Sequence, residues 1–431
     1  MRIESLKDNY LCRSTLLLWL FITFLFCLPI IVVANEQESE DKYPSHKEGI
    51  TIIDLDDGIA IVPGNLIREK ALITAAYRGD MVEAEELLKV GINPNALEIT
   101  KKVSPLMVAA QEGHRQMVEM LLRYGAKTDL VSKLGSTALI FAAEKERLDV
   151  MELLITHGAD VNQATKARGT ALLVATRRGL IESVKLLLAK GADPNIINET
   201  GDFPLLVAIQ LNNQDIFKLL LDYKANINAV DEDGETPLIL AAYKGQDEAV
   251  KLLLAKEAEL DKKDKEGGTA LTYAAQQGNN NIVTILLNEG AEVNSLTTNG
   301  HSPLLQATIE GHYQAAELLL KGGALVDQAD QSGNTTPLMS AASNGDDKIT
   351  ELLLKYGAAV EKTTPSGSTA LMNAVMYKKI NVVKKLVAAG ADPWRKSYYG
   401  IDAYTEAKTF NCQECLKIFD QKKKHHWDTE L

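Results

Sequence analysis

The chain has 431 residues, of which 46% are apolar and 24% charged, and its formal net charge is -12 at pH 7. These values exclude a largely disordered chain and a membrane protein with many spans. An acidic chain also repels the phosphates of nucleic acid on average, so nucleic acid is not expected as a partner. Four cysteines are too few to hold a chain of this length together as a small disulfide scaffold.

The first predicted element is an export segment at residues 1–34. Residues 15–34 are apolar and uncharged, with basic residues before them and acidic residues after them. Small side chains lie three residues and one residue before Asn35, so a signal peptidase is expected to cut between Ala34 and Asn35. The apolar run is also about 20 residues long, which is enough to span a bilayer as an uncleaved anchor. The sequence therefore supports two interpretations of this segment, a cleaved signal peptide and an uncleaved membrane anchor.

Both alternatives place the chain after Asn35 outside the cytoplasm, because the basic flank stays on the cytoplasmic side. We expect a protein exported across the inner membrane, periplasmic or secreted, or else a single-pass anchored protein with the rest of its chain on the far side. Residues 35–49 are polar and acidic and are predicted to be a disordered linker. Residues 50–64 contain ITIIDLDDGIAIV, which predicts a hairpin that turns at Asp57-Gly58 and caps the region after it.

Most of the chain repeats a unit of 33 or 34 residues. Leucines mark the period at Leu72, Leu106, Leu139, Leu172, Leu205, Leu238, Leu271, Leu304, Leu338 and Leu371. In the unit at residues 234–266, Thr236 can cap a helix and Pro237 suits its first turn. Leu238 shares one helix face with two small alanines, Gly245 ends the helix, and a second amphipathic helix follows.

Helices of about ten residues are marginal alone, so the units must be stabilised by stacking, as in a solenoid. The sequences TPLILAAYKG (residues 236–245) and HGADVN (residues 157–162) resemble those of the ankyrin repeat family. The resemblance implies an all-α ankyrin repeat solenoid. About ten helix-turn-helix units would occupy residues 65–399, a C-terminal capping repeat residues 400–424, and a tail residues 425–431.

The sequence departs from the family pattern at two kinds of position. No unit has the histidine that follows the Pro-Leu pair in the family, so the hydrogen bonds made by that histidine are not expected. Asn212, Lys224 and Glu257 stand where the family has glycines. Holding the backbone of a non-glycine residue in the left-handed region of φ and ψ lowers the stability of the folded state by on the order of 1 kcal/mol. We therefore expect the junction between Lys224 and Glu257 to be the weakest in the stack.

The sequence gives little support for an enzyme, because it has no Walker-type phosphate loop, no HExxH and no GxSxG. Cys412 and Cys415 form a CxxC pair. Packing or a disulfide in the cap is the first interpretation, a metal site with His425 and His426 the second, and redox catalysis the third. We expect no catalytic residue, no metal site and no cofactor.

The resemblance also implies where a partner would bind, because loop tips and the outward positions of the first helices line a concave surface in ankyrin arrays. By register these positions hold Lys133, Lys166, Arg168, Arg177, Arg178, Tyr243 and Tyr377. The five basic residues predict attraction of an acidic partner surface, and the alternative is that they only solvate the protein. Tyr377 belongs to an aromatic group near the C-terminus that could anchor an interface, or could pack within the cap.

The resemblance implies a non-catalytic scaffold or inhibitor that binds another protein, and the export segment predicts that it acts outside the cytoplasm. The alternative function is a membrane-tethered structural spacer. A secreted effector aimed at a host and a CxxC redox protein are further hypotheses. Contact with a membrane is expected only through residues 1–34, if these stay uncleaved.

Overall fold

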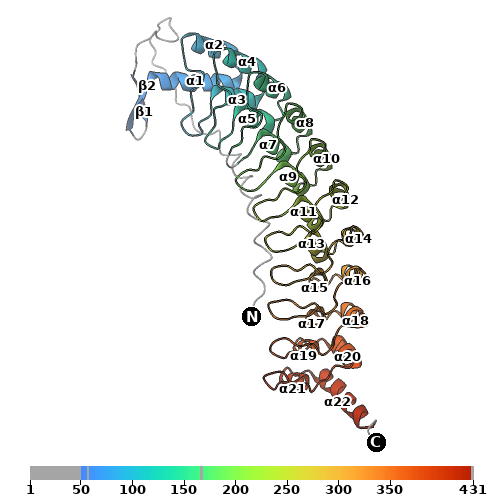
Figure 1. The fold of residues 1–431 in the computed structure, drawn as a ribbon. Coiled ribbons are helices and arrows are strands. Elements are labelled where there is room, and N and C mark those ends of the chain that lie inside the picture. Colours follow the sequence, from blue (N-terminus) through green and yellow to red (C-terminus); the bar gives the residue numbers. More distant parts are fainter. Residues whose placement is uncertain (1–49, 56–57, 166–167, 429–431) are drawn as a thin grey trace. The chain divides into compact units, whose positions relative to one another are not determined.

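The computed structural model describes residues 50–55, 58–165 and 168–428, all within one compact unit, Ile50–Leu431 (Figure 1). The expected signal peptide or anchor at residues 1–34 and the linker at residues 35–49 lie outside the described residues. Within the described ranges, no helix is both long enough and apolar enough to cross a bilayer.

The described part begins with the expected hairpin. Strand β1 (Ile50–Leu55) pairs antiparallel with β2 (Gly58–Pro63), from Ile50 opposite Pro63 to Leu55 opposite Gly58. The predicted turn at Asp57-Gly58 is wrong by one residue, because Gly58 already belongs to β2 and pairs with Leu55. Asp57 lies outside the described residues. Strand β2 leads directly into the first helix.

The described residues form 22 helices, which follow one another as pairs. The first helices of the pairs are α1 (Gly64–Arg78), α3 (Pro105–Glu112), α5 (Ala138–Glu144), α7 (Ala171–Arg178), α9 (Pro204–Gln210), α11 (Pro237–Tyr243), α13 (Ala270–Gln277), α15 (Pro303–Ile309), α17 (Pro337–Asn344), α19 (Ala370–Met376) and α21 (Ala403–Thr409). The second helices are α2 (Met81–Lys89), α4 (Arg115–Arg123), α6 (Leu148–Thr156), α8 (Ile181–Ala189), α10 (Gln214–Asp222), α12 (Asp247–Ala255), α14 (Asn280–Asn288), α16 (Tyr313–Lys321), α18 (Asp347–Lys355), α20 (Ile380–Ala388) and α22 (Gln413–Asp428).

The pairs stack in chain order, which confirms the predicted solenoid fold class. Figure 1 shows the first helices in one row and the second helices in another, with the connecting loops projecting beyond the first row. We call the pair α1/α2 unit one, continue to unit ten at α19/α20, and call α21/α22 the cap. Helix α22 runs to Asp428, past residue 424, where the capping repeat was expected to end.

The capping residues act as the sequence predicts. Thr236 precedes α11, and its hydroxyl accepts a hydrogen bond from the Ile239 N–H at 3.1 Å. A Ser, Thr or Asp does the same before every other first helix from α3 to α21, except α9. Phe203 precedes α9 and gives no side-chain cap. Unit five therefore lacks a stabilising feature that its neighbours have.

The core lies between consecutive units. Leu238, Ala241 and Ala242 of α11 are almost wholly buried, and the same positions are buried in the other units. Small alanines allow neighbouring helices to approach closely, and each buried leucine contributes about 1.5–3 kcal/mol. The position of the family's histidine holds a buried apolar residue in most units, such as Met107 and Ile140.

Polar side chains also link each unit to its neighbour. In the loops after most second helices, an amide or carboxylate oxygen accepts a hydrogen bond from a backbone N–H of the next unit. Examples are Asn95 with Lys127 (2.8 Å) and Asn294 with Leu325 (2.8 Å). Residues before some second helices reach back in the other direction: the His114 Nε2 lies 3.0 Å from the Tyr77 carbonyl oxygen. These bonds fix the register of the stack.

The non-glycine residues expected in the left-handed region are found there. The φ angles of Asn212, Lys224 and Glu257 are 53°, 61° and 66°. Five further non-glycine residues share this conformation, and these are Lys102, Glu146, Asn334, Lys378 and Asn411. Left-handed non-glycine residues therefore strain the backbone in several units. The missing side-chain cap before α9, in contrast, is a feature of unit five.

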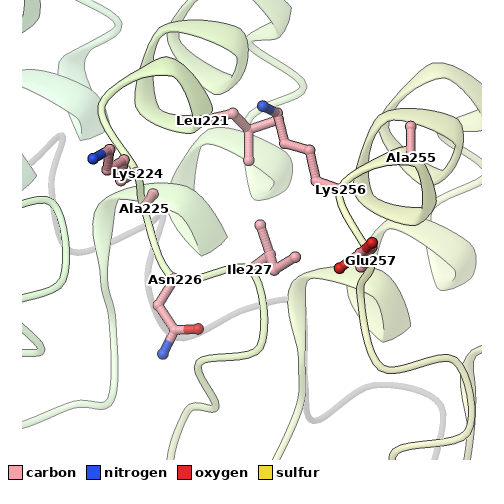
Figure 2. A pocket seen from close by; sticks show the side chains of 8 residues that line it. All are labelled: Leu221, Lys224, Ala225, Asn226, Ile227, Ala255, Lys256 and Glu257. Atoms are coloured by element: carbon pink, nitrogen blue, oxygen red, sulfur yellow. The ribbon is translucent and has the colours of Figure 1, made fainter.

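Packing also singles out the junction between units five and six. Helices α9 and α11 are the least closely packed of the consecutive first helices, and α10 and α12 the least of the second. A cleft of about 420 Å³ opens there between the ends of the second helices (Figure 2). Its lining is Leu221, Lys224, Ala225, Asn226, Ile227, Ala255, Lys256 and Glu257. The junction predicted to be weakest thus also has a cleft between its second helices.

Replacing Lys224 or Glu257 by Gly is expected to raise the free energy of unfolding by about 1 kcal/mol each, because the backbone strain is relieved. The matched control is Lys256→Gly, beside Glu257 but at a φ of -100°, which should destabilise by about 0.5–1 kcal/mol. Hydrogen exchange should show the amides of α10 and α12 opening before those of α4 and α6. Greater protection in the middle units than at the ends of the stack would contradict the prediction.

Candidate protein-recognition face

One side of the stack carries the positions at which the sequence predicts binding. We define the recognition face as the residues at and beside the tip of each loop before a first helix, together with the last residues of that first helix and the two residues that follow it. The loops lie beyond the first helices, on the side away from the second helices (Figure 1). Stacking fixes the backbone of this face, so its side chains are presented by rigid elements.

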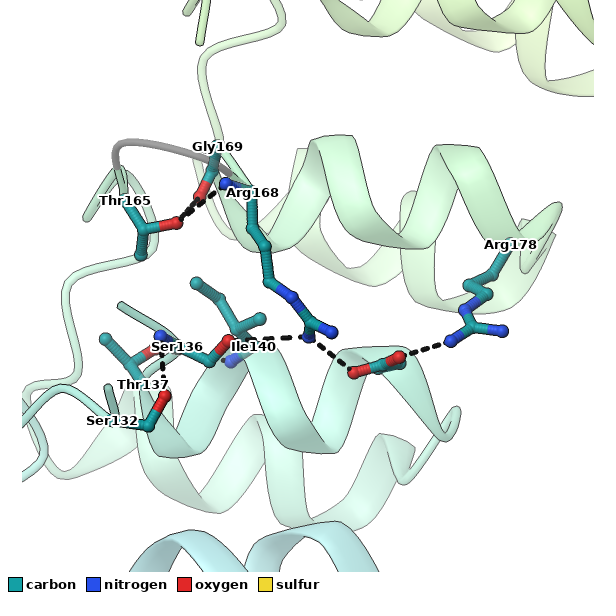
Figure 3. A network of polar contacts seen from close by, with 9 residues as sticks. Ser132, Ser136, Thr137, Ile140, Thr165, Arg168, Gly169 and Arg178 are labelled. Atoms are coloured by element: carbon teal, nitrogen blue, oxygen red, sulfur yellow. Dashed lines mark hydrogen bonds and ion pairs between the residues drawn. The ribbon is translucent and has the colours of Figure 1, made fainter. Parts of the chain in front are cut away.

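Two of the predicted basic residues meet on one carboxylate. The Arg168 Nη1 lies 2.9 Å from the Glu144 Oε2, and Arg178 pairs with the other oxygen of the same group (Figure 3). Arg168 also donates a hydrogen bond to the Ser136 hydroxyl at 3.4 Å. The Glu144 side chain is only 12% exposed. Burial alone would raise the pKa of Glu144, but Arg168 and Arg178 together hold it below its ordinary value.

The third arginine is paired in the same way. Arg177, also in unit four, forms an ion pair with Asp202 in the loop of unit five. The three arginines therefore join units three, four and five, and their charges are neutralised inside the chain. Lys133 stays exposed, with its backbone N–H bonded to the Lys101 carbonyl oxygen at 2.8 Å. Lys166 lies outside the described residues.

Replacing Glu144 by Gln is expected to destabilise the protein by about 1–3 kcal/mol, because two arginines lose a partly buried partner. The wild type should lose this stabilisation as pH falls through the lowered pKa of Glu144, whereas the Gln variant has none to lose. Glu182→Gln, which removes an exposed pair with Lys185, should change stability by at most about 0.5 kcal/mol. Equal urea midpoints for the two variants would contradict the role of Glu144.

The middle of the recognition face is acidic. Tyr243 lies edge-on to Tyr273, with 6.1 Å between ring centroids, and the Tyr273 hydroxyl donates a hydrogen bond to Asp264 at 2.5 Å. Burial, followed by the charges of Asp231 and Asp264, raises the pKa of Glu235 to about 7. Tyr243 itself is 43% exposed. An acidic partner would therefore be repelled at this predicted contact residue.

Glu235 should make the middle units less stable as pH rises. The folded pKa of Glu235, about 7, lies above the ordinary value of a glutamate carboxyl, so the folded state loses stability relative to the unfolded state as pH rises from that ordinary value to about 7. We expect Glu235→Gln to raise the melting temperature relative to wild type near about pH 8, and to leave it nearly unchanged near about pH 4. A pH-independent difference in melting temperature would contradict this prediction.

The C-terminal end of the face presents exposed aromatic rings. Tyr377, Tyr398 and Tyr399 are 56%, 82% and 79% exposed, so packing within the cap does not explain them. Tyr377 directly follows α19, whereas Tyr398 and Tyr399 lie at the tip of the last loop. Met376, Ile401 and Phe410 are exposed at further positions of the same two units. Large apolar groups therefore occur on both the loop side and the helix side of this end.

The CxxC pair forms a disulfide between Cys412 and Cys415, with 5.3 Å between the Cα atoms. Cys412 directly precedes α22 and Cys415 lies in its first turn, and both side chains are buried. Burial keeps both sulfur atoms from reaction partners, which argues for a structural disulfide. His425 and His426 lie outside the residues whose side chains are described. Within the described part, no three His, Cys, Asp or Glu residues are placed to hold a metal ion.

Comparison with known proteins agrees with this architecture. The family model for ankyrin repeats (three copies) matches residues 60–132, 106–198, 172–264, 257–330 and 323–397. The chain therefore belongs to the ankyrin repeat family, whose members typically bind other proteins and are typically not catalysts. It is also similar to the 2-5A-dependent ribonuclease of Mus musculus, with 38% identity over 72 residues. That stretch is 17% of this chain and 10% of the ribonuclease.

Proposed function

We propose that this chain is a non-catalytic scaffold or inhibitor that holds another protein against its recognition face, outside the cytoplasm. The observation that carries the proposal is the exposure of Tyr377, Tyr398 and Tyr399 on rigid elements of that face. Tyrosines supply large contact areas with few rotatable bonds, and they are enriched among the residues that dominate binding energy. The stack leaves them free because its own core is complete without them.

Two sequence features support action outside the cytoplasm. Residues 1–34 have the charge and apolar pattern of an export segment. Cys412 and Cys415 are the only cysteines after that segment, and they form a disulfide, which persists in oxidising compartments. The length of the apolar run also supports a second candidate function, a membrane-tethered spacer that keeps residues 1–34.

Export is tested by fractionation and protease protection of intact cells, followed by mass spectrometry of the N-terminus. The proposal expects protection to be lost when the outer barrier is opened, and a mature chain that begins at Asn35. An intact N-terminus in the membrane fraction would favour the tethered spacer. A wholly cytoplasmic, uncleaved and soluble product would reject export.

The binding role is tested by replacing Tyr377, Tyr398 and Tyr399 together by Ala. Loss of such anchors is expected to weaken capture of the partner at least about 30-fold, corresponding to about 2 kcal/mol or more. Affinity capture from the native compartment, with quantitative mass spectrometry, compares the variant with the wild type.

The matched control replaces three other exposed tyrosines, Tyr124, Tyr223 and Tyr356, which follow second helices and lie off the recognition face. This control should capture the partner as the wild type does. If both triple variants capture the same proteins equally well, the recognition face is not the binding site.

A further inference from the structure

The structure also indicates which kind of partner surface the C-terminal end of the face would accept. We propose that this end binds an acidic, extended segment of the partner, with its apolar side chains on the exposed tyrosines and its carboxylates beside Lys378 and Lys396. The inference rests on the proposed function and adds the chemistry of the ligand. It concerns units nine and ten and the cap.

Charge is distributed unevenly along the recognition face. In units five to seven the loop tips carry several carboxylates, such as Glu232, Asp233 and Glu266. In units nine and ten the corresponding positions are uncharged, with Gln331 and Ser366 as examples. A partner that carries carboxylates would be repelled by the middle of the face and accepted at its C-terminal end.

The charged residues next to the tyrosines are mainly basic. Lys378 directly follows Tyr377, and Lys396 lies two residues before Tyr398. Both lysines are exposed. The neighbouring Arg395 is different, because it pairs with Glu361 at 3.0 Å and is neutralised within the chain. Two exposed cations thus flank the aromatic surface, one on the helix side and one on the loop side.

Two nearby acidic groups are withdrawn from the surface, whereas Asp392, four residues before Lys396, is exposed and accepts a hydrogen bond from the Trp394 N–H at 3.0 Å. The buried Asp402 caps α21, where its carboxylate accepts a hydrogen bond from the Thr405 N–H at 2.7 Å. Glu406 is half-buried, and burial together with Asp402 raises its pKa to about 7. Near neutral pH its negative charge is therefore partly removed. Lys378 and Lys396 are then the exposed charges nearest in sequence to the tyrosines.

Lys378 has a left-handed backbone conformation, which glycine adopts more readily than lysine. Its φ is 53°, and the left-handed conformation occurs at the same place in other units, at glycines such as Gly113 and Gly179 and also at Glu146, Asn212 and Asn411. A lysine at this point is strained, and strained residues often belong to functional sites. Backbone conformation and charge can therefore be separated by substitution at this residue.

The experiment selects short random peptides displayed on phage with the full chain after residue 34 as bait. We expect the enriched peptides to combine acidic residues with aromatic or aliphatic ones. A synthetic enriched peptide should bind about fivefold more weakly to Lys378→Gln and to Lys396→Gln, and at least about 30-fold more weakly to the variant with all three tyrosines replaced by Ala. Lys355→Gln, an exposed change on α18, should leave the affinity unchanged.

The variant Lys378→Gly distinguishes a loss of binding from a loss of folding, because the two measurements should change in opposite directions. It should raise the melting temperature, because strain is relieved, and still weaken peptide binding about fivefold. Lys224→Gly is the backbone control, and it should raise the melting temperature with no change in binding.

The outcomes separate this inference from the proposed function. Enrichment of basic or uncharged peptides that still need the tyrosines would overturn the inference and keep the binding face. Peptides that bind the tyrosine variant as tightly as the wild type would overturn both. Tyrosine-dependent binding to vesicles containing phosphatidylglycerol, with no peptide enriched, would assign the surface to a membrane and also overturn the inference.

Discussion

Burial of helix faces between consecutive units is the interaction on which the rest of this structure depends. Second helices of nine residues, such as α4 and α12, are too short to be stable alone. Each unit is therefore stabilised by its neighbours, and the stability of the whole is close to a sum over the junctions. Because leucine and alanine at fixed positions complete this core, the loop tips and the helix ends are free to vary.

The polar residues have two different roles that composition cannot distinguish. Some bind neighbouring units together, as Glu144 does between two arginines. Others remain at the surface, as Lys378 and Lys396 do. A basic cluster in the sequence is therefore no guide to surface potential until the partners of each charge are known. In this chain the three arginines predicted to bind a partner instead link units three to five, through Glu144 and Asp202.

The repeat made most of the fold predictable from sequence. Caps such as Thr236 and left-handed glycines such as Gly125 depend on local geometry, which one unit reveals and the others repeat. The left-handed Lys224 and Glu257 were predictable for the same reason. The hairpin was expected, but its turn was misplaced by one residue, because pairing extends to Gly58.

The candidate site was less predictable. Arg168 meets Glu144 from 24 residues away, and only the stacking of units three and four brings the two side chains together. The exposure of Tyr398 and Tyr399 could not be separated from cap packing by spacing alone, since both depend on what covers the last loop.

The central claim is that the aromatic end of the recognition face holds another protein where this protein works. Site-specific photo-crosslinking in intact cells tests it most directly, with the photoreactive residue placed at Tyr399 or, for comparison, at the exposed Lys384 of the second-helix row. We expect one discrete protein adduct from position 399 and none from position 384. Equal adducts at both positions, or none at position 399, would contradict the account.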